Sequence, residues 1–155
     1  MVATEPVKRE RKHDRVSALL TEMRLTDVRA DNPELLVLYL AYRQKFNLGD
    51  YFDEKAHVSK RWRAMYFQGR MLSVFGERDK ADGTLEVTDA YCEDSRFGQV
   101  AVCVMFLAYL GIVNRGEKKR LHFTVAFENI KMWNTVVREI KRPPIALVFE
   151  YEGAT

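Results

Sequence analysis

The stretch Val100-Ala-Val-Cys-Val-Met-Phe-Leu-Ala-Tyr-Leu-Gly-Ile-Val113 decides the fold, because the order of the sheet depends on whether it is a helix or a strand. Its 14 uncharged residues are too few to span a membrane, which takes about 20, so they belong in a core. Val102 and Val104 continue the alternation of a strand, whereas a run of this length is more typical of a buried helix. The length favours the helix, and the strand stays open.

The residues before this stretch predict helices. Apolar residues at helical spacing place one over 14–25, and a turn follows over 26–31. Asn32 can cap the next helix, Pro33 suits its first position and Glu34 favours the positive end of its dipole. The run that follows is apolar almost all round, so this second helix should be central and buried.

Strand patterns surround the decisive stretch on both sides. Apolar residues on both parities predict a long strand over 61–75, bent at Gly69, and residues 84–91 pair back on it as a hairpin. The remaining elements are predicted in the order strand, helix, strand, over 121–127, 130–140 and 145–151.

This mixture has no regular βαβ repeat. It predicts an α+β fold in which a mostly antiparallel sheet of about four strands packs against helices. Residues 1–12 lack apolar periodicity and are expected to form a flexible basic arm, followed by N-terminal helices. Residues 13–155 are expected to form a single domain.

The net charge lies in the arm. The chain carries 25 basic and 22 acidic residues, a formal charge of +3, and residues 8–15 alone account for +3. The basic residues of the arm are expected to bind an anionic partner, either a membrane surface or a nucleic acid or nucleoprotein. They are Lys8, Arg9, Arg11, Lys12 and Arg15.

A second basic group follows at Lys60, Arg61 and Arg63, interleaved with Trp62 and followed by Tyr66. Basic and aromatic residues in such a pattern can hold a nucleic-acid backbone and stack bases. Strand alternation, however, sends Trp62 and Tyr66 to one face and the two arginines to the other. A packed core with a basic edge is therefore the competing interpretation.

Two further segments differ in charge. If these segments lie at opposite ends of the domain, the acidic end of one molecule could bind the basic end of the next. This head-to-tail contact predicts self-association. The acidic segment holds Glu86, Asp89, Glu93 and Asp94, and the basic one holds Arg115, Lys118, Lys119 and Arg120. Plain solvated turns would have the same composition.

Motifs for catalysis or metal binding do not stand out. His13, His57 and His122 have no ligand spacing, and Cys92 and Cys103 fit no zinc pattern. No phosphate-binding glycine motif or serine nucleophile motif is present. We therefore expect no catalytic residue, no cofactor and no metal, although a carboxylate pair formed only in the fold stays open.

The layout resembles the small matrix proteins of rhabdoviruses, which have a basic arm ahead of one α+β domain. The likeness rests on Lys8 to Arg15, Met65 to Val74, Val100 to Gly111 and Ile130 to Tyr151. A Pro-Pro-x-Tyr motif is absent, because Ile145 and Ala146 follow the two prolines. The resemblance implies self-association, membrane contact and nucleocapsid binding.

These features predict a non-enzymatic structural or interaction protein, matrix-like, that associates with itself and uses no small-molecule substrate. A sequence-independent RNA-binding protein is the first alternative, and a small enzyme with an unfamiliar carboxylate site is the second. The expected location is intracellular, with peripheral contact to a membrane, because residues 1–14 hold no apolar run.

Overall fold

The computed structural model describes residues 22–49, 52–140 and 144. The chain separates into two units, one ending at Thr124 and the other starting at Val125. Each unit is described by itself below.

The first unit is built on a five-stranded sheet with its strands in sequence order. Neighbouring strands are antiparallel, except that β4 and β5 run parallel. The strands are β1 (Arg24–Val28), β2 (Arg61–Phe67), β3 (Arg70–Asp79), β4 (Thr84–Cys92) and β5 (Arg120–Phe123). The predicted α+β fold with a mostly antiparallel sheet is thus confirmed.

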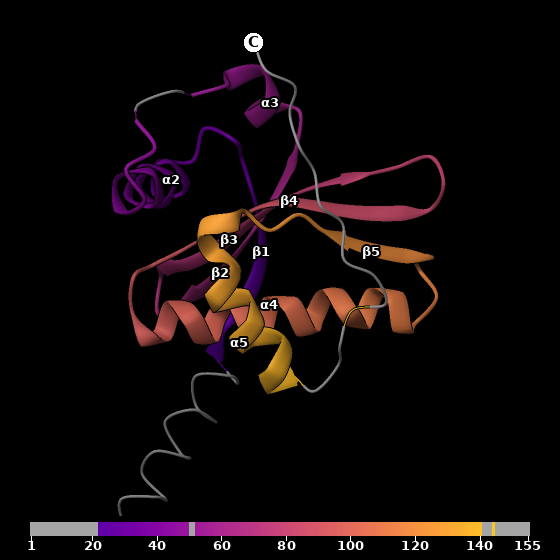
Figure 1. The fold of residues 1–155 in the computed structure, drawn as a ribbon. Coiled ribbons are helices and arrows are strands. Elements are labelled where there is room, and N and C mark those ends of the chain that lie inside the picture. The colour runs from indigo at the N-terminus through magenta and orange to yellow at the C-terminus, as the bar shows by residue number, and fades with distance from the viewer. Residues whose placement is uncertain (1–21, 50–51, 141–143, 145–155) are drawn as a thin grey trace, which may run out of the picture. The chain divides into compact units, whose positions relative to one another are not determined.

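Helices cover both faces of this sheet (Figure 1). On one face lie α2 (Pro33–Lys45) and the short α3 (Glu54–Val58), and on the other lies α4 (Arg96–Asn114). The predicted start of α2 is confirmed, because the Asn32 side chain accepts hydrogen bonds from the amides of Glu34 and Leu35. The long α4 makes the crossover that parallel strands require.

Alternation along the strands divides the core between the two faces. Toward α2, Val74 and Trp62 pack with Leu35 and Leu38. Toward α4, the Phe75 ring stacks on Tyr109 with centroids 5.6 Å apart. The sheet is therefore the middle of three layers in this unit.

The decisive stretch is a helix, as its length favoured. α4 buries Ala101, Val102, Met105 and Tyr109, and it contacts β3, β4 and β5. Among the described residues it is also the one helix long and apolar enough to cross a membrane by length and composition alone. One side of the helix packs on the sheet, while Phe97 and Leu107 are exposed.

Two predicted elements differ from the structure: the long strand over 61–75 and the end of the helix over 14–25. The predicted long strand is a hairpin, because Gln68 and Gly69 both have positive φ, 49° and 75°, as a two-residue type I′ turn requires. The helix predicted over 14–25 does not include its last residues, since Arg24 and Leu25 start β1. All but one of the residues in β1 are exposed, so the strand is held by its hydrogen-bond ladder with β2 and no apolar pattern marked it.

The second unit contains a short 3₁₀ turn, Phe127–Asn129, and α5 (Ile130–Ile140). The predicted helix over 130–140 is confirmed, with Trp133 and Val136 buried. The predicted strand over 121–127 is shorter than expected and ends at Phe123. The predicted last strand over 145–151 and the arm lie outside the described residues.

Candidate functional site

The end of β4 is separated from β5. The two strands pair from Thr84 with Arg120 to Val87 with Phe123, and the amide of Thr124 still donates to Val87. Beyond that point β4 continues to Cys92, and β3 is its only partner strand among the residues that the structure describes. Residues 88–92 thus present a backbone edge that an extended ligand can pair with.

A bulge marks the point of separation. Val87 lies opposite Glu77 and Asp89 lies opposite Gly76, so Thr88 is an extra residue in β4. Such a bulge bends the strand and re-aims the side chains that follow it. Because of it, Asp89 and Tyr91 both face α2.

The N-terminus of α4 follows directly on this free edge. Ser95 caps the helix by accepting a hydrogen bond from the amide of Gly98 at 3.1 Å. The amides of Arg96 and Phe97 come before the first intrahelical bonds and have no partner among the described residues. Two donors and the positive end of a 19-residue helix can therefore receive an anion.

The loop between β4 and α4 needs Gly98. A Cβ at this position would lie 2.0 Å from the carbonyl oxygen of Glu93, which is closer than any packing allows. The absence of a side chain lets residues 93–95 fold back over the first turn of α4.

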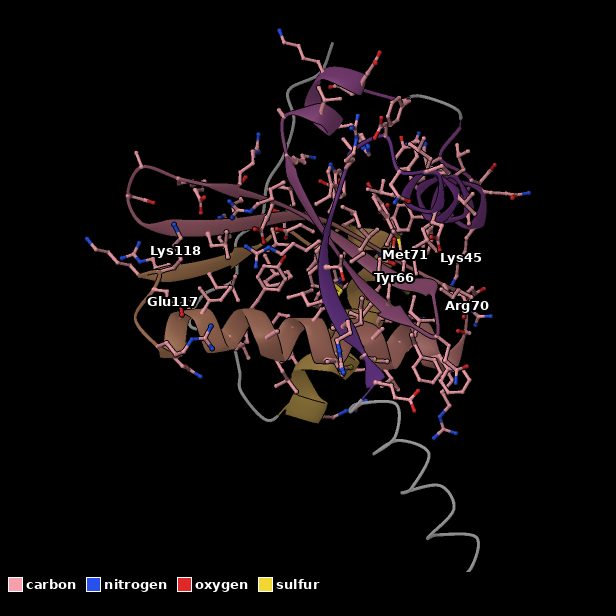
Figure 2. All side chains as sticks on the ribbon, turned by 180° about the vertical axis from the view of Figure 1, so that it is seen from behind. Lys45, Tyr66, Arg70, Met71, Glu117 and Lys118 are labelled. Atoms are coloured by element: carbon pink, nitrogen blue, oxygen red, sulfur yellow. The ribbon has the colours of Figure 1, made fainter. Side chains whose placement is uncertain are left out.

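Charged residues surround this N-terminus. Arg70 pairs with Glu93 at 2.9 Å and Lys45 pairs with Asp94 at 3.1 Å, and Arg96 is exposed. Figure 2 shows Lys45 and Arg70 at the same end of the unit. Glu93 also accepts from the Ser95 hydroxyl at 2.5 Å, so one carboxylate of the chain itself lies beside the free amides.

Asp89 is the most connected carboxylate on the α2 side of β4. It accepts from Lys60, from the Thr88 hydroxyl at 2.7 Å and from the Tyr91 hydroxyl at 2.8 Å. Burial and the nearby Asp89 charge raise the pKa of Tyr91 far above its usual range. Tyr91 is therefore a neutral hydroxyl at physiological pH.

A hollow of about 190 Å³ lies between α2 and α3. Asp89 is not among its lining residues, but Lys60 in its wall binds the Asp89 carboxylate. Its lining residues are Tyr39, Arg43, Phe52, Asp53, Ala56, His57 and Lys60. The His57 ring is fixed by a hydrogen bond from its Nε2 to the carbonyl of Ala30, 2.6 Å long.

A second charged cluster lies on the other face of the sheet. Glu77 is fully buried and is paired by Arg61 and, at 3.1 Å, by Arg63. Burial and the adjacent Glu77 charge raise the pKa of Tyr109 far above its usual range. Glu77 and Tyr109 are buried in this cluster, whereas the Arg61 side chain is 43% exposed. We assign the cluster to the stability of the fold.

The predicted basic residues therefore do not share one surface. Lys60 faces α2 and binds Asp89, while Arg61 and Arg63 lie on the α4 side with Glu77. This separation agrees with the strand alternation expected for Trp62 and Tyr66. The basic residues of the arm lie outside the described part of the chain, and their role stays a prediction.

The predicted self-association residues mostly contact the chain's own charges. Glu86 pairs with Arg78 at 2.8 Å and with Lys80 at 2.6 Å, and Lys118 pairs with Asp79 at 2.9 Å. Figure 2 shows Lys118 and Glu117 at the end opposite Arg70. Contacts between molecules through these residues stay a prediction.

Sequence reasoning missed the α4 N-terminus and the hollow. Ser95 followed by Gly98 before an apolar helix is a start signal that the sequence contains. The hollow has no such signal, because its residues come from α2, from α3 and from the loops before and after α3. Groups of three or more metal-ligating side chains are absent from the described ranges.

Comparison with known proteins defines the fold. No family model and no curated protein matches the sequence. An aminoglycoside acetyltransferase from an uncultured soil metagenomic sample, solved with trehalose and with sisomicin, matches with a TM-score of 0.58 and 8% identity over 87% of this chain and 98% of that one.

Two further acetyltransferases are similar. A ribosomal-protein-alanine N-acetyltransferase from Brucella melitensis biovar Abortus has a TM-score of 0.58 and 11% identity over 86% of this chain and 97% of that one. An aminoglycoside N-acetyltransferase in complex with CoA has a TM-score of 0.53 and 12% identity over 86% and 95%. At these identities the likeness establishes an acetyltransferase fold.

Several expectations from the sequence are thereby corrected. The resemblance to rhabdovirus matrix proteins is wrong, because the similar structures have acetyltransferase folds. The interpretation as a non-enzymatic, self-associating structural protein is overturned by the same neighbours. So is the expectation of no small-molecule substrate, since the solved neighbours hold CoA or sisomicin. These expectations were wrong because composition shows a basic arm and an apolar core but does not show that β4 separates from β5.

Proposed function

We propose that this chain is an acyltransferase that moves an acyl group from acyl-coenzyme A to an amine. The observation that carries the proposal is the separation of β4 from β5 beyond Val87, next to the N-terminus of α4. The fold it shares with acetyltransferases supports the same conclusion. We place the activity inside the cell, where acyl-CoA is made.

The residues present fit coenzyme A. Its diphosphate would be held by the amides of Arg96 and Phe97 and by the Arg96 side chain, because free amides at a helix start bind phosphates. Its extended pantetheine arm would pair with the free edge over residues 88–92. When bound, the coenzyme supplies a thioester, so that a C–S bond breaks as the C–N bond of the amide forms.

Asp89 is the residue we assign to the acceptor amine. Its carboxylate attracts the ammonium group, which must lose one proton to water before the nitrogen can attack. As the neutral amine then attacks the thioester and coenzyme A leaves as its thiolate, the carboxylate stabilises the positive charge that develops on the nitrogen. The carboxylate oxygen accepts the proton that the nitrogen loses. Lys60 and Thr88 hold Asp89 in position, and the neutral Tyr91 hydroxyl keeps its second oxygen oriented.

Calorimetric titration of the full chain with coenzyme A tests the proposal. We expect saturable binding that weakens in Arg96→Gln, which removes a charge at the start of α4. Arg115→Gln is the matched control, because Arg115 is exposed at the other end of the same helix. A folded protein that binds no coenzyme A, or equal binding in both variants, would overturn the proposal.

Thiol release from acetyl-CoA in the presence of amines is the second measurement. We expect release by the unmodified chain and loss in Asp89→Asn, with coenzyme A binding retained. The amide keeps most hydrogen bonds of the carboxylate but cannot take up the proton. Unchanged release in Asp89→Asn would remove Asp89 from the reaction.

A further inference from the structure

The hollow between α2 and α3 is small and is built largely from rings. Drug-sized ligands occupy clefts of about 300–1,000 Å³, whereas this one measures about 190 Å³. The space suits a single ring or a short apolar chain. A substrate of several linked sugar rings exceeds it.

Aromatic edges and faces form its walls. The Tyr39 and Phe52 rings meet edge to face with centroids 5.3 Å apart, and Phe52 and His57 lie 5.0 Å apart. Rings placed in this way accept a further flat apolar group by offset or edge-to-face packing. Phe52 is 39% exposed, so its ring is not consumed by the core.

The charges around the hollow select against polycations. Arg43 is fixed there by hydrogen bonds to the carbonyls of Leu48 and Gly49, and Lys60 adds a second positive charge. Asp53 is the acid among the lining residues, and its side chain caps α3. A ligand with several ammonium groups would bring some of them beside Arg43.

A single ammonium group, in contrast, has a place at Asp89. An ionised carboxylate offers about four acceptor positions, and Lys60, Thr88 and Tyr91 use three of them. One position is left for a donor, and the hollow adjoins this carboxylate through Lys60, which binds Asp89, and Tyr39, which contacts Tyr91. A ring in the hollow and an amine at Asp89 would be parts of one molecule.

We infer that the acceptor is a small primary amine carried on an aromatic or apolar group, with no further positive charge. That the bound amine is an acyl acceptor rests on the proposed function. The selectivity among amines rests on the hollow. Aminoglycosides, after which two of the similar acetyltransferases are named, do not suit this hollow.

Binding of 2-phenylethylamine, observed by saturation-transfer NMR and titrated to saturation, tests the inference on the full chain. 2-Phenylethanol lacks the ammonium group, spermidine lacks the ring, and sisomicin represents the polycations. We expect 2-phenylethylamine to bind more tightly than all three. Equal or tighter binding of spermidine or sisomicin overturns the inference.

Two variants locate the binding. Phe52→Ala removes one wall and should weaken 2-phenylethylamine about tenfold. Leu40→Ala is the matched control, since Leu40 is 57% exposed on α2 and does not line the hollow. Unchanged affinity in Phe52→Ala, with the control intact, contradicts the inference.

Coenzyme A titrations on the same samples separate this inference from the proposed function. Binding of coenzyme A without selective binding of the aromatic amine overturns the inference and leaves acyl transfer standing. Binding of the aromatic amine without coenzyme A overturns the proposed function, and the hollow then remains a binding site for that amine class.

Discussion

Glu77 is a fully buried carboxylate between Arg61 and Arg63, and its second oxygen has no hydrogen-bond partner among the described residues. Charges in such a place are expensive to remove from water, and their mutual attraction offsets that penalty only while every partner is present. The cluster joins β2, β3 and α4, so a substitution at one of its residues weakens the packing of all three elements.

Replacing Glu77 with alanine should therefore lower the free energy of unfolding by about 3 kcal/mol. Both arginines lose their buried partner and keep only the more exposed carboxylates of Asp79 and Asp27. Urea unfolding measures this change. Glu117→Ala, which removes an exposed ion pair with Arg115, should leave the free energy of unfolding almost unchanged. A similar loss in both variants would contradict the assignment of Glu77 as a buried structural charge.

Glu93 is expected to weaken the binding of coenzyme A. Its carboxylate lies at the N-terminus of α4, where the coenzyme diphosphate is proposed to bind, and like charges repel. Glu93→Gln should tighten coenzyme A binding by a few-fold in calorimetry at low salt, and salt should reduce the gain. Glu54→Gln, exposed on α3, should not change the affinity. Weaker binding in Glu93→Gln would show that Glu93 supports the site.

Glu86 makes stability depend on pH. Hydrogen bonding from Lys80, with Arg78 adding to it, lowers the pKa of Glu86 below its ordinary value of 4.5. A carboxyl with a lowered folded-state pKa contributes stability above its unfolded pKa, and that contribution is lost as the pH falls through the folded value. As the pH is lowered below about 4.5, the urea concentration at half unfolding should decrease. The decrease should be smaller in Glu86→Gln.

At the scale of elements, the link between β4 and α4 depends on one residue without a side chain. Gly98→Ala would press a methyl group against the carbonyl of Glu93. We expect thermal unfolding to show a loss of about 2 kcal/mol or more. In Gly111→Ala the new methyl group meets only the flexible end of the Arg115 side chain, and better helix propensity should leave stability equal or higher by up to about 1 kcal/mol.

Elements with their own local signal were predictable from the sequence. Asn32-Pro33 marked α2, and the length of the apolar run marked α4. β1 was not predictable, because its exposed residues carry no pattern and its ladder with β2 forms only in the fold. The hairpin at Gln68 was missed for a related reason, since glutamine rarely adopts the positive φ that the turn requires.

The candidate site was less predictable than the fold. Asp89 was chosen from the sequence as part of an acidic segment, without the bulge at Thr88 that turns it toward α2. A bulge depends on the register between two strands, which no local pattern specifies. The hollow lined by Tyr39, Phe52 and His57 likewise depends on how α2 and α3 pack.

At the scale of the whole first unit, four strands pair as successive neighbours and the fifth joins through a crossover. β5 has four residues and is the last strand of the sheet that the described residues form, so its amides should exchange hydrogen faster than those of β3. Hydrogen exchange followed by mass spectrometry measures the difference. Equal protection would mean that β5 opens only together with the rest of the sheet.

The sequential strand order has a consequence for synthesis of the protein. A ribosome releases β1 to β4 in the order in which they pair, so each strand meets its neighbour as soon as it emerges. β5 can dock only after α4, 19 residues long, has followed β4 out of the exit tunnel. A nascent chain that has left the exit tunnel as far as Cys92 can therefore already form the hairpins of the acceptor side, while the edge that we assign to coenzyme A does not yet have its parallel partner.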